Sequence, residues 1–142
     1  MKGKTIVLLL FPLLLFSACG KQSDVITVQH VLIAFEGTIP GKEINRTKEE
    51  AAVLAAQIFG RAKKGEDFDA LVKEYTDDSH PGIYKMANFD VPADPGQQIF
   101  ERGRMVKAFG DIGFDLGVDE VGLAVFHPDT SKYGWHIIKR LE

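Results

Sequence analysis

Two apolar segments near opposite ends of the 142-residue chain each carry one histidine, and they constrain the fold more than any other feature. Residues 26–35 and 132–139 are rich in β-branched and aromatic side chains, as β-strands typically are. His30 lies in the middle of the first segment and His136 in the middle of the second, whose strand is predicted to start at a turn at Gly134. On the residues alone, two interpretations stay open. The histidines either belong to one polar site in a single sheet, or they are two unrelated core histidines.

Composition narrows the class of protein. The chain has the length of one domain, and 45% of its residues are hydrophobic, which suffices to bury a core. Its net charge is −3, with acidic and basic residues interspersed, so it lacks the basic patch typical of proteins that bind nucleic acids. We therefore expect no nucleic-acid partner.

Three segments have the features of helices. Thr47 and Glu50 form a capping box at the start of the first, because each side chain can bond the backbone N–H of the other. Asp67 starts the second, and the third is predicted over residues 104–116 from the spacing of its apolar residues. We expect the first two helices to pack against the sheet.

The first 18 residues are typical of a secretory signal peptide. Lys2 and Lys4 give a positive start, residues 5–16 are apolar, and two small residues precede Cys19. The apolar run is short for a transmembrane helix. Cys19 is the only cysteine, so no disulfide can form within the chain.

The sequence Leu15-Phe16-Ser17-Ala18-Cys19-Gly20 resembles a bacterial lipobox, in which the cysteine is diacylated and becomes the new N-terminus. It departs from that motif at Phe16, where leucine is usual. The alternative is a plain secretory signal cleaved nearby, but lipidation accounts for a lone thiol in an exported protein. We expect a lipoprotein-type signal peptide over residues 1–18, a lipid-anchored tether over 19–24 and a folded domain over 25–142.

Three further segments resemble motifs of the parvulin (PpiC-type) peptidyl-prolyl isomerases, in the family's order and with fitting spacing. The opening strand of the family resembles His30-Val31-Leu32-Ile33, and the closing strand resembles Gly134-Trp135-His136-Ile137-Ile138. The family's Arg-Gly-x-Met-Val-x-x-Phe segment resembles Arg102-Gly103-Arg104-Met105-Val106-Lys107-Ala108-Phe109. The resemblance implies an α+β fold with a four-stranded, mainly antiparallel sheet surrounded by about three to four helices, whose first and last strands are neighbours.

The resemblance implies a polar, catalytic centre made of His30, His136 and Asp78. The two imidazoles would hydrogen-bond to each other, and Asp78 would face them from the end of the second helix. A shift of one residue in the alignment would give this place to Asp77 instead. The other alternative is that neither carboxylate belongs to the site, and that Asp77 and Asp78 are a solvated pair at the helix end. A metal site built from the same three residues is a weaker interpretation, because they do not have the local spacing of metal ligands. We expect no metal and no cofactor.

The substrate would bind beside this centre, in an apolar pocket. The side chains that the resemblance assigns to substrate binding are Met105, Phe109 and Tyr133. The hydroxyl groups available as partners for the imidazoles are those of Thr76 and Ser131. Helical spacing alone would place Met105 and Phe109 in the core, so their role depends on the resemblance.

The chain departs from the family between residues 80 and 96. Parvulins usually have Gly-Gly-Asp-Leu-Gly there, and the leucine helps to form the floor of the proline pocket. Three residues of this chain, Ile83, Met86 and Phe89, are candidates for that place, and the sequence does not choose among them. In the loop after the first strand, Ala34 stands where phosphopeptide-selective parvulins have their first basic residue, so we expect no selectivity for phosphate.

We therefore expect a peptidyl-prolyl cis-trans isomerase that rotates X–Pro bonds in an apolar pocket without covalent chemistry. It would act as a monomer on unfolded or partly folded exported polypeptides. The lipid on Cys19 would hold it outside the cytoplasm on a bacterial membrane, and Lys21 favours the outer membrane. The alternative is a non-catalytic extracytoplasmic chaperone or peptide-binding module on the same fold. The altered segment 80–96 favours that alternative, whereas the two histidines oppose it.

Overall fold

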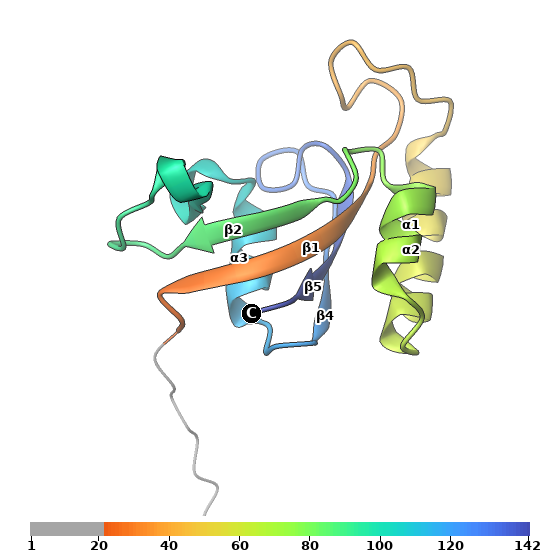
Figure 1. Ribbon diagram of the computed structural model, residues 1–142. Coiled ribbons are helices and arrows are strands. Elements are labelled where there is room, and N and C mark those ends of the chain that lie inside the picture. Colours follow the sequence, from red (N-terminus) through yellow and green to blue (C-terminus); the bar gives the residue numbers. More distant parts are fainter. Residues whose placement is uncertain (1–21) are drawn as a thin grey trace, which may run out of the picture.

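The computed structural model describes residues 22–142, so the predicted signal peptide and Cys19 lie outside the described residues. A five-stranded sheet forms its centre, with α1 and α2 on one side and α3 on the other (Figure 1). The strands are β1 (Val25–Ile33), β2 (Ile83–Ala87), β3 (Ile99–Glu101), β4 (Val121–Ala124) and β5 (Trp135–Arg140). The helices are α1 (Lys48–Lys63), α2 (Phe68–Tyr75) and α3 (Lys107–Asp115), and two short 3-10 helices are η1 (Pro95–Gln97) and η2 (Arg102–Arg104).

The two histidine-bearing strands lie side by side in the middle of the sheet, whose order is β3-β2-β1-β5-β4. β1 and β5 are antiparallel, with His30 opposite Ile138 and Leu32 opposite His136. Because side chains alternate along a strand and paired residues share a face, both histidines project from the same face of the sheet. The predicted adjacency of the first and last strands is confirmed.

The sheet separates two apolar clusters. On one face, side chains of β1 and β5 such as Val31 and Ile137 pack against α1 and α2. On the other face, Val28 and Ile138 pack against α3. The central strands are therefore covered on both sides, which explains why residues 26–35 are apolar almost throughout.

The predicted starts of the first two helices are confirmed. Thr47 Oγ1 accepts from the Glu50 N–H at 3.2 Å, and Glu50 Oε2 accepts from the Thr47 N–H at 2.7 Å, which completes the capping box of α1. Asp67 Oδ1 accepts from the Ala70 N–H at 2.8 Å and caps α2. Both bonds satisfy N–H groups that a helix start leaves without a partner.

The third helix and the number of strands differ from expectation. The predicted helix 104–116 is interrupted, because Met105 has extended backbone angles between η2 and α3. The sheet has five strands rather than four, because β3, which follows the divergent segment, adds in parallel to β2 at one edge. The α+β class itself is confirmed. None of the helices within residues 22–142 is long and apolar enough to cross a membrane.

Gly134 sets the position of β5 against β1. Its φ angle is +145°, and a Cβ atom built on it would lie 2.1 Å from the carbonyl oxygen of Ile33. Only a residue without a side chain fits at that distance. The predicted glycine turn therefore serves a close approach of two backbones, next to the strand that carries His136.

Candidate functional site

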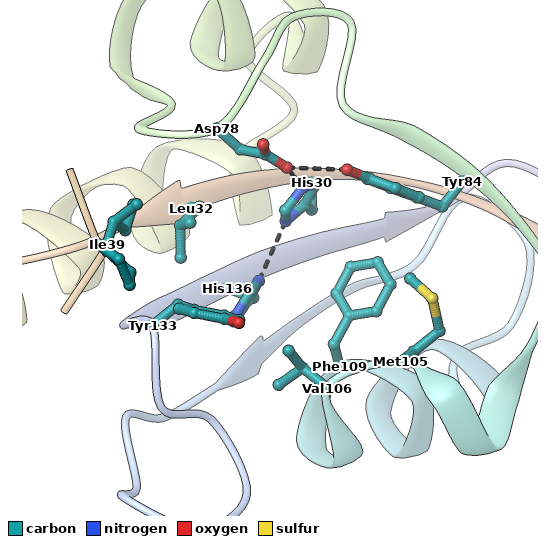
Figure 2. A pocket seen from close by; sticks show the side chains of 11 residues that line it. His30, Leu32, Ile39, Asp78, Tyr84, Met105, Val106, Phe109, Tyr133 and His136 are labelled. Atoms are coloured by element: carbon teal, nitrogen blue, oxygen red, sulfur yellow. Dashed lines mark hydrogen bonds and ion pairs between the residues drawn. The ribbon is translucent and has the colours of Figure 1, made fainter. Parts of the chain in front are cut away.

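The two buried histidines form a direct pair. His30 Nδ1 lies 3.1 Å from His136 Nδ1, and the rings are nearly parallel with centroids 5.3 Å apart (Figure 2). The side chains are only 3% and 4% exposed. The distance falls within the predicted hydrogen-bond range. The interpretation as two unrelated core histidines is therefore wrong.

A carboxylate hydrogen-bonds to the histidine pair through His30. Asp78 Oδ2 lies 3.1 Å from His30 Nε2 and comes from the turn that follows α2. Thr76 holds this turn against β1, because its Oγ1 accepts from the N–H groups of Leu32 at 3.1 Å and of Asp78 at 3.2 Å. The predicted place of Asp78 at the end of the second helix is found.

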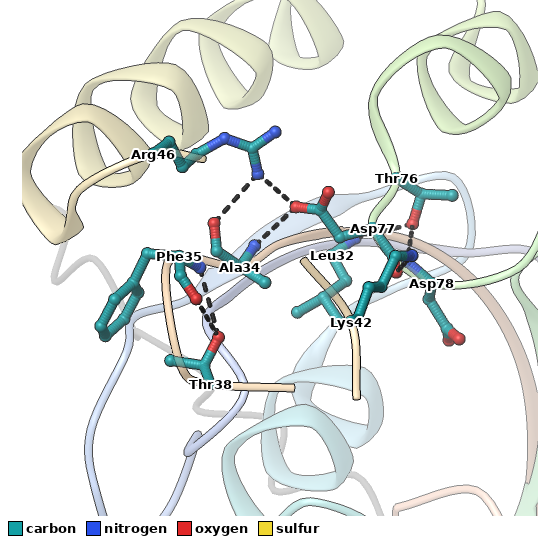
Figure 3. Close-up of polar contacts among 9 residues, drawn as sticks. All are labelled: Leu32, Ala34, Phe35, Thr38, Lys42, Arg46, Thr76, Asp77 and Asp78. Carbon is teal, nitrogen blue, oxygen red and sulfur yellow. Dashed lines mark hydrogen bonds and ion pairs between the residues drawn. The ribbon is translucent and has the colours of Figure 1, made fainter. Parts of the chain in front are cut away.

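The Asp77 carboxylate is directed toward Ala34 and Arg46 (Figure 3), whereas the carboxylate that bonds His30 is that of Asp78, which removes the alternative assignment. Its Oδ2 accepts from the Ala34 N–H at 2.8 Å and forms an ion pair with Arg46. Its backbone carbonyl accepts from the Lys42 ammonium. The two basic residues of the loop after β1 are thus both engaged by Asp77.

The hydroxyls predicted as partners of the imidazoles bond to the backbone instead. Thr76 accepts two backbone N–H groups, as described above, and Ser131 Oγ donates to the carbonyl of Gly134 at 2.8 Å. These hydroxyls shape the turns that present Asp78 and His136 rather than contacting the rings. Within residues 22–142, His136 Nε2 is buried without a hydrogen-bond partner.

The surroundings fix the charges of the centre at neutral pH. Burial, reinforced by the neighbouring His30, lowers the pKa of His136 to about 3. Asp78 has its pKa held well below the usual range by the hydrogen bond from His30, with smaller contributions from the Ser79 backbone and Tyr84. His136 is therefore neutral and Asp78 is ionised. Since a carboxylate only accepts, His30 Nε2 carries the proton that it donates to Asp78.

An apolar cavity of about 360 Å³ lies over this centre, in the range of small-ligand pockets (Figure 2). Phe109 from α3 covers the histidines, with its ring centroid 5.0 Å from that of His30 and 5.5 Å from that of His136. Met105 and Tyr133 line the same cavity, so the structure brings all three predicted substrate-binding side chains to one place. The full lining is His30, Leu32, Ile39, Pro40, Asp78, Tyr84, Met105, Val106, Phe109, Tyr133 and His136.

None of the three candidates for the missing pocket wall is part of the cavity. Ile83 and Phe89 are 47% and 60% exposed, and Met86 is fully buried in the core beside α3. The wall is Tyr84, which the sequence reasoning missed. A usable signal was present, because strand alternation places residue 84 on the same face as the buried Met86.

Tyr84 is also part of the polar centre. Its hydroxyl donates to Asp78 Oδ2 at 2.9 Å, and its ring meets His30 and Phe109 edge to face at 5.4 and 5.8 Å. Burial and the hydrogen bond to the charged Asp78 raise the pKa of Tyr84 to about 12. One oxygen of Asp78 thus receives two donors, His30 and Tyr84.

The polar groups are arranged for hydrogen bonding to one another rather than for binding an ion. Both nitrogens of His30 are engaged, one by His136 and one by Asp78. In the part of the chain that the structure describes, no group of three His, Cys, Asp or Glu side chains is arranged to hold a metal ion. The site therefore consists of an apolar cavity above a polar floor whose groups hydrogen-bond to one another, except at His136 Nε2.

Comparison with known proteins agrees with this architecture. The family model of the PPIC-type PPIase domain matches residues 12–142. Chaperone SurA of Chromohalobacter salexigens is 36% identical over 124 residues, which are 84% of this chain and 24% of that protein. Foldase protein PrsA of Caldanaerobacter subterraneus is 34% identical over 116 residues, which are 82% of this chain and 28% of that protein.

Among solved structures, the solution structure of TbPIN1 has the same fold, with a TM-score of 0.61 at 20% identity over 84% of this chain and 99% of that chain. The chain spans about a quarter of the length of the curated relatives named above. The match to the family model covers all of the described residues. The chain therefore belongs to the family of PPIC-type PPIase domains.

Proposed function

We propose that this chain is a peptidyl-prolyl cis-trans isomerase that assists the folding of exported polypeptides. The observation that carries the proposal is the apolar cavity directly above the buried His30–His136 pair. The family supports an isomerase-type domain, and relatives named as a chaperone and a foldase support a role in protein folding.

The reaction needs no covalent step. Rotation of an X–Pro bond faces a barrier of about 18–20 kcal/mol, because resonance keeps the amide planar and places negative charge on its oxygen. The twisted transition state has less resonance and a smaller dipole. A site that removes water from the carbonyl therefore destabilises the planar amide relative to the twisted one.

The residues of the cavity suit this task. Phe109 and Met105 offer apolar surface to the pyrrolidine ring, which would hold one end of the bond while the carbonyl turns. His136 is neutral, and both ring nitrogens of His30 are engaged by His136 and Asp78. His30 therefore has no free N–H group to donate to the carbonyl of the X–Pro bond. The roles of His30, His136 and Asp78 are thus to shape the floor and its field, with no nucleophile. Tyr133 would contact the bound peptide at the rim.

The test is a protease-free NMR exchange assay on blocked peptides that contain one proline. The purified chain should accelerate cis-trans exchange, and His30→Ala with His136→Ala should remove most of the acceleration while peptide binding persists. Wild-type protein that binds the peptides without accelerating exchange would refute catalysis.

A non-catalytic chaperone or peptide-binding module is the second candidate. Tyr84 favours it, because a hydroxyl-bearing ring stands where the family usually has a leucine pocket floor. Wild-type protein that suppresses client aggregation without accelerating exchange would support this alternative, since binding would then occur without catalysis.

The proposed location is outside the cytoplasm of a bacterial cell, where a lipid on Cys19 would anchor the protein to a membrane. Lys21 favours the outer membrane, and the protein would act there as a monomer. A single acyl chain gives only marginal membrane binding, whereas a diacylated cysteine provides two. Cys19→Ser should therefore release the protein from membranes or leave its precursor uncleaved. Mass spectrometry that finds the wild-type mature protein with an unmodified Cys19, or beginning after it, would contradict the anchor.

A further inference from the structure

The edge strand β3, which follows the divergent segment, places a second aromatic ring beside the pocket wall. Phe100 lies on β3 at the edge of the sheet and is 47% exposed. Its ring centroid is 6.1 Å from that of Tyr84, which is in turn 5.8 Å from that of Phe109. Tyr84 therefore contacts both the ring inside the cavity and the ring outside it.

The strand register puts Phe100 on the face of the sheet that bears the cavity. β3 is parallel to β2, with Phe100 paired to Met86. Met86 packs against α3 and shares its face with Tyr84. Lys85, which pairs with Ile99, belongs to the opposite face. The apolar surface thus continues from Phe109 over Tyr84 to Phe100.

The charges next to Phe100 do not favour a charged ligand. Glu101 and Arg104 flank it and form an ion pair with each other at 2.8 Å, so their charges cancel. Lys85 lies on the other face of the sheet. What remains on the cavity side is the exposed ring itself, which is best covered by another apolar group.

We propose that Phe100 and the outer side of Tyr84 form a second binding position for a large apolar side chain of the same polypeptide whose proline occupies the cavity. This inference rests on the proposed function for the position of the proline. An extended peptide advances roughly 3.3 Å per residue, so the side chain would be about one to three residues from the proline. The position gives the chain a preference for apolar sequences around the X–Pro bond.

The experiment compares blocked peptides that carry one proline and either glycine, leucine or phenylalanine at each of the three positions on either side. Exchange rates are measured by NMR for the wild type and for Phe100→Ala, Phe100→Leu and Val53→Ala. Val53 is the matched control, because it is 59% exposed and lies on α1, across the sheet from the cavity. Circular dichroism verifies that each variant is folded.

We expect the wild type to prefer leucine or phenylalanine over glycine at one of these positions by about three- to tenfold in kcat/KM, the range of one aromatic contact. Phe100→Ala should abolish this preference with little change for glycine peptides. Phe100→Leu should retain part of it, and Val53→Ala should retain all of it. An equal preference in Phe100→Ala, or a wild type that accelerates exchange equally for all of the peptides, would overturn the proposal.

A parallel titration separates this proposal from the proposed function. The same peptides are added to ¹⁵N-labelled protein, and Kd is obtained from shift changes. If the wild type isomerises none of them but binds the leucine and phenylalanine peptides more tightly through Phe100, the catalytic function fails and the second binding position stands. If Kd is the same for all peptides, or none binds, the second position is refuted.

Discussion

Acidification should destabilise the fold through the titration of His136, at a higher pH than through the titration of any carboxylate. The folded pKa of His136 is about 3, because the ring is buried beside His30, whereas the ordinary value is 6.5. Between these two values the unfolded chain binds a proton that the folded chain does not. Stability therefore falls as the pH drops below about 6.5, and it rises again with pH through the same window.

The size of this loss of stability follows from the size of the shift in the pKa of His136. Each pH unit below 6.5 costs about 1.4 kcal/mol as long as the folded ring stays neutral. At pH 4.5 the loss relative to pH 7.5 should be about 2–3 kcal/mol, a large part of the 5–15 kcal/mol that typical domains have. Asp78 also has a lowered pKa, so its contribution is lost in the same direction, but only as the pH falls through its ordinary value of 3.8. A measurement at pH 4.5 therefore reports mainly on His136.

The assay is urea unfolding at pH 7.5, 6.0 and 4.5, with the free energy of unfolding extrapolated to water. The perturbation is His136→Gln, which keeps a neutral polar side chain beside His30 but cannot titrate. Its loss between pH 7.5 and 4.5 should be about 2–3 kcal/mol smaller than that of the wild type. The control is His80→Gln, because the His80 side chain is 43% exposed and its change should leave most of the loss in place. If His136→Gln loses as much stability as the wild type, the neutral state assigned to His136 is wrong.

The remaining predictions concern the pocket, the histidine pair and the turn before β5. Phe109→Ala removes the side chain of a residue that is 2% exposed, so it should lower the free energy of unfolding by about 3–5 kcal/mol. It should also lower the exchange rate per folded molecule, and an unchanged rate would make Phe109 a core residue only. Because His30 and His136 contact each other, His30→Ala with His136→Ala should cost much less than the sum of the two single losses in exchange rate, whereas additive losses would show independent roles. Gly134→Ala should unfold the chain or displace β5, since its Cβ would overlap the Ile33 carbonyl, and a stable variant in circular dichroism would contradict the close approach.

The sequence predicted the parts of the fold that depend on local chemistry. The capping box at Thr47, the N-cap at Asp67 and the Gly134 turn each follow from one or a few neighbouring residues, and all three are present. The third helix was predicted too long because the periodicity of its apolar residues continues through Met105. The extended backbone at that residue is a tertiary feature that periodicity does not record.

The parts of the site that match the family's motifs were predictable from the resemblance. The part that lies where the chain departs from the family was not. The pairing of His30 with His136 depends on two strands about a hundred residues apart in sequence, and local spacing could not distinguish it from two core histidines. Tyr84 falls outside the expected candidates, because a wall that a leucine usually forms predicts an apolar side chain at that place. Its hydroxyl fits in the wall because Asp78 accepts its hydrogen bond, whereas a wholly apolar pocket would leave the hydroxyl without a partner.

The adjacent carboxylates of Asp77 and Asp78 join the two sides of the cavity. Asp78 faces inward and holds His30 and Tyr84, whereas Asp77 faces outward and holds Arg46 and Lys42 of the loop after β1. That loop contributes Ile39 and Pro40 to the lining of the cavity, and Ile39 lies across the cavity from Tyr84 (Figure 2). Because the two aspartates are consecutive, a movement of the turn after α2 would shift both walls together. The turn after α2 therefore anchors both walls of the cavity, and its two carboxylates do so through different donors.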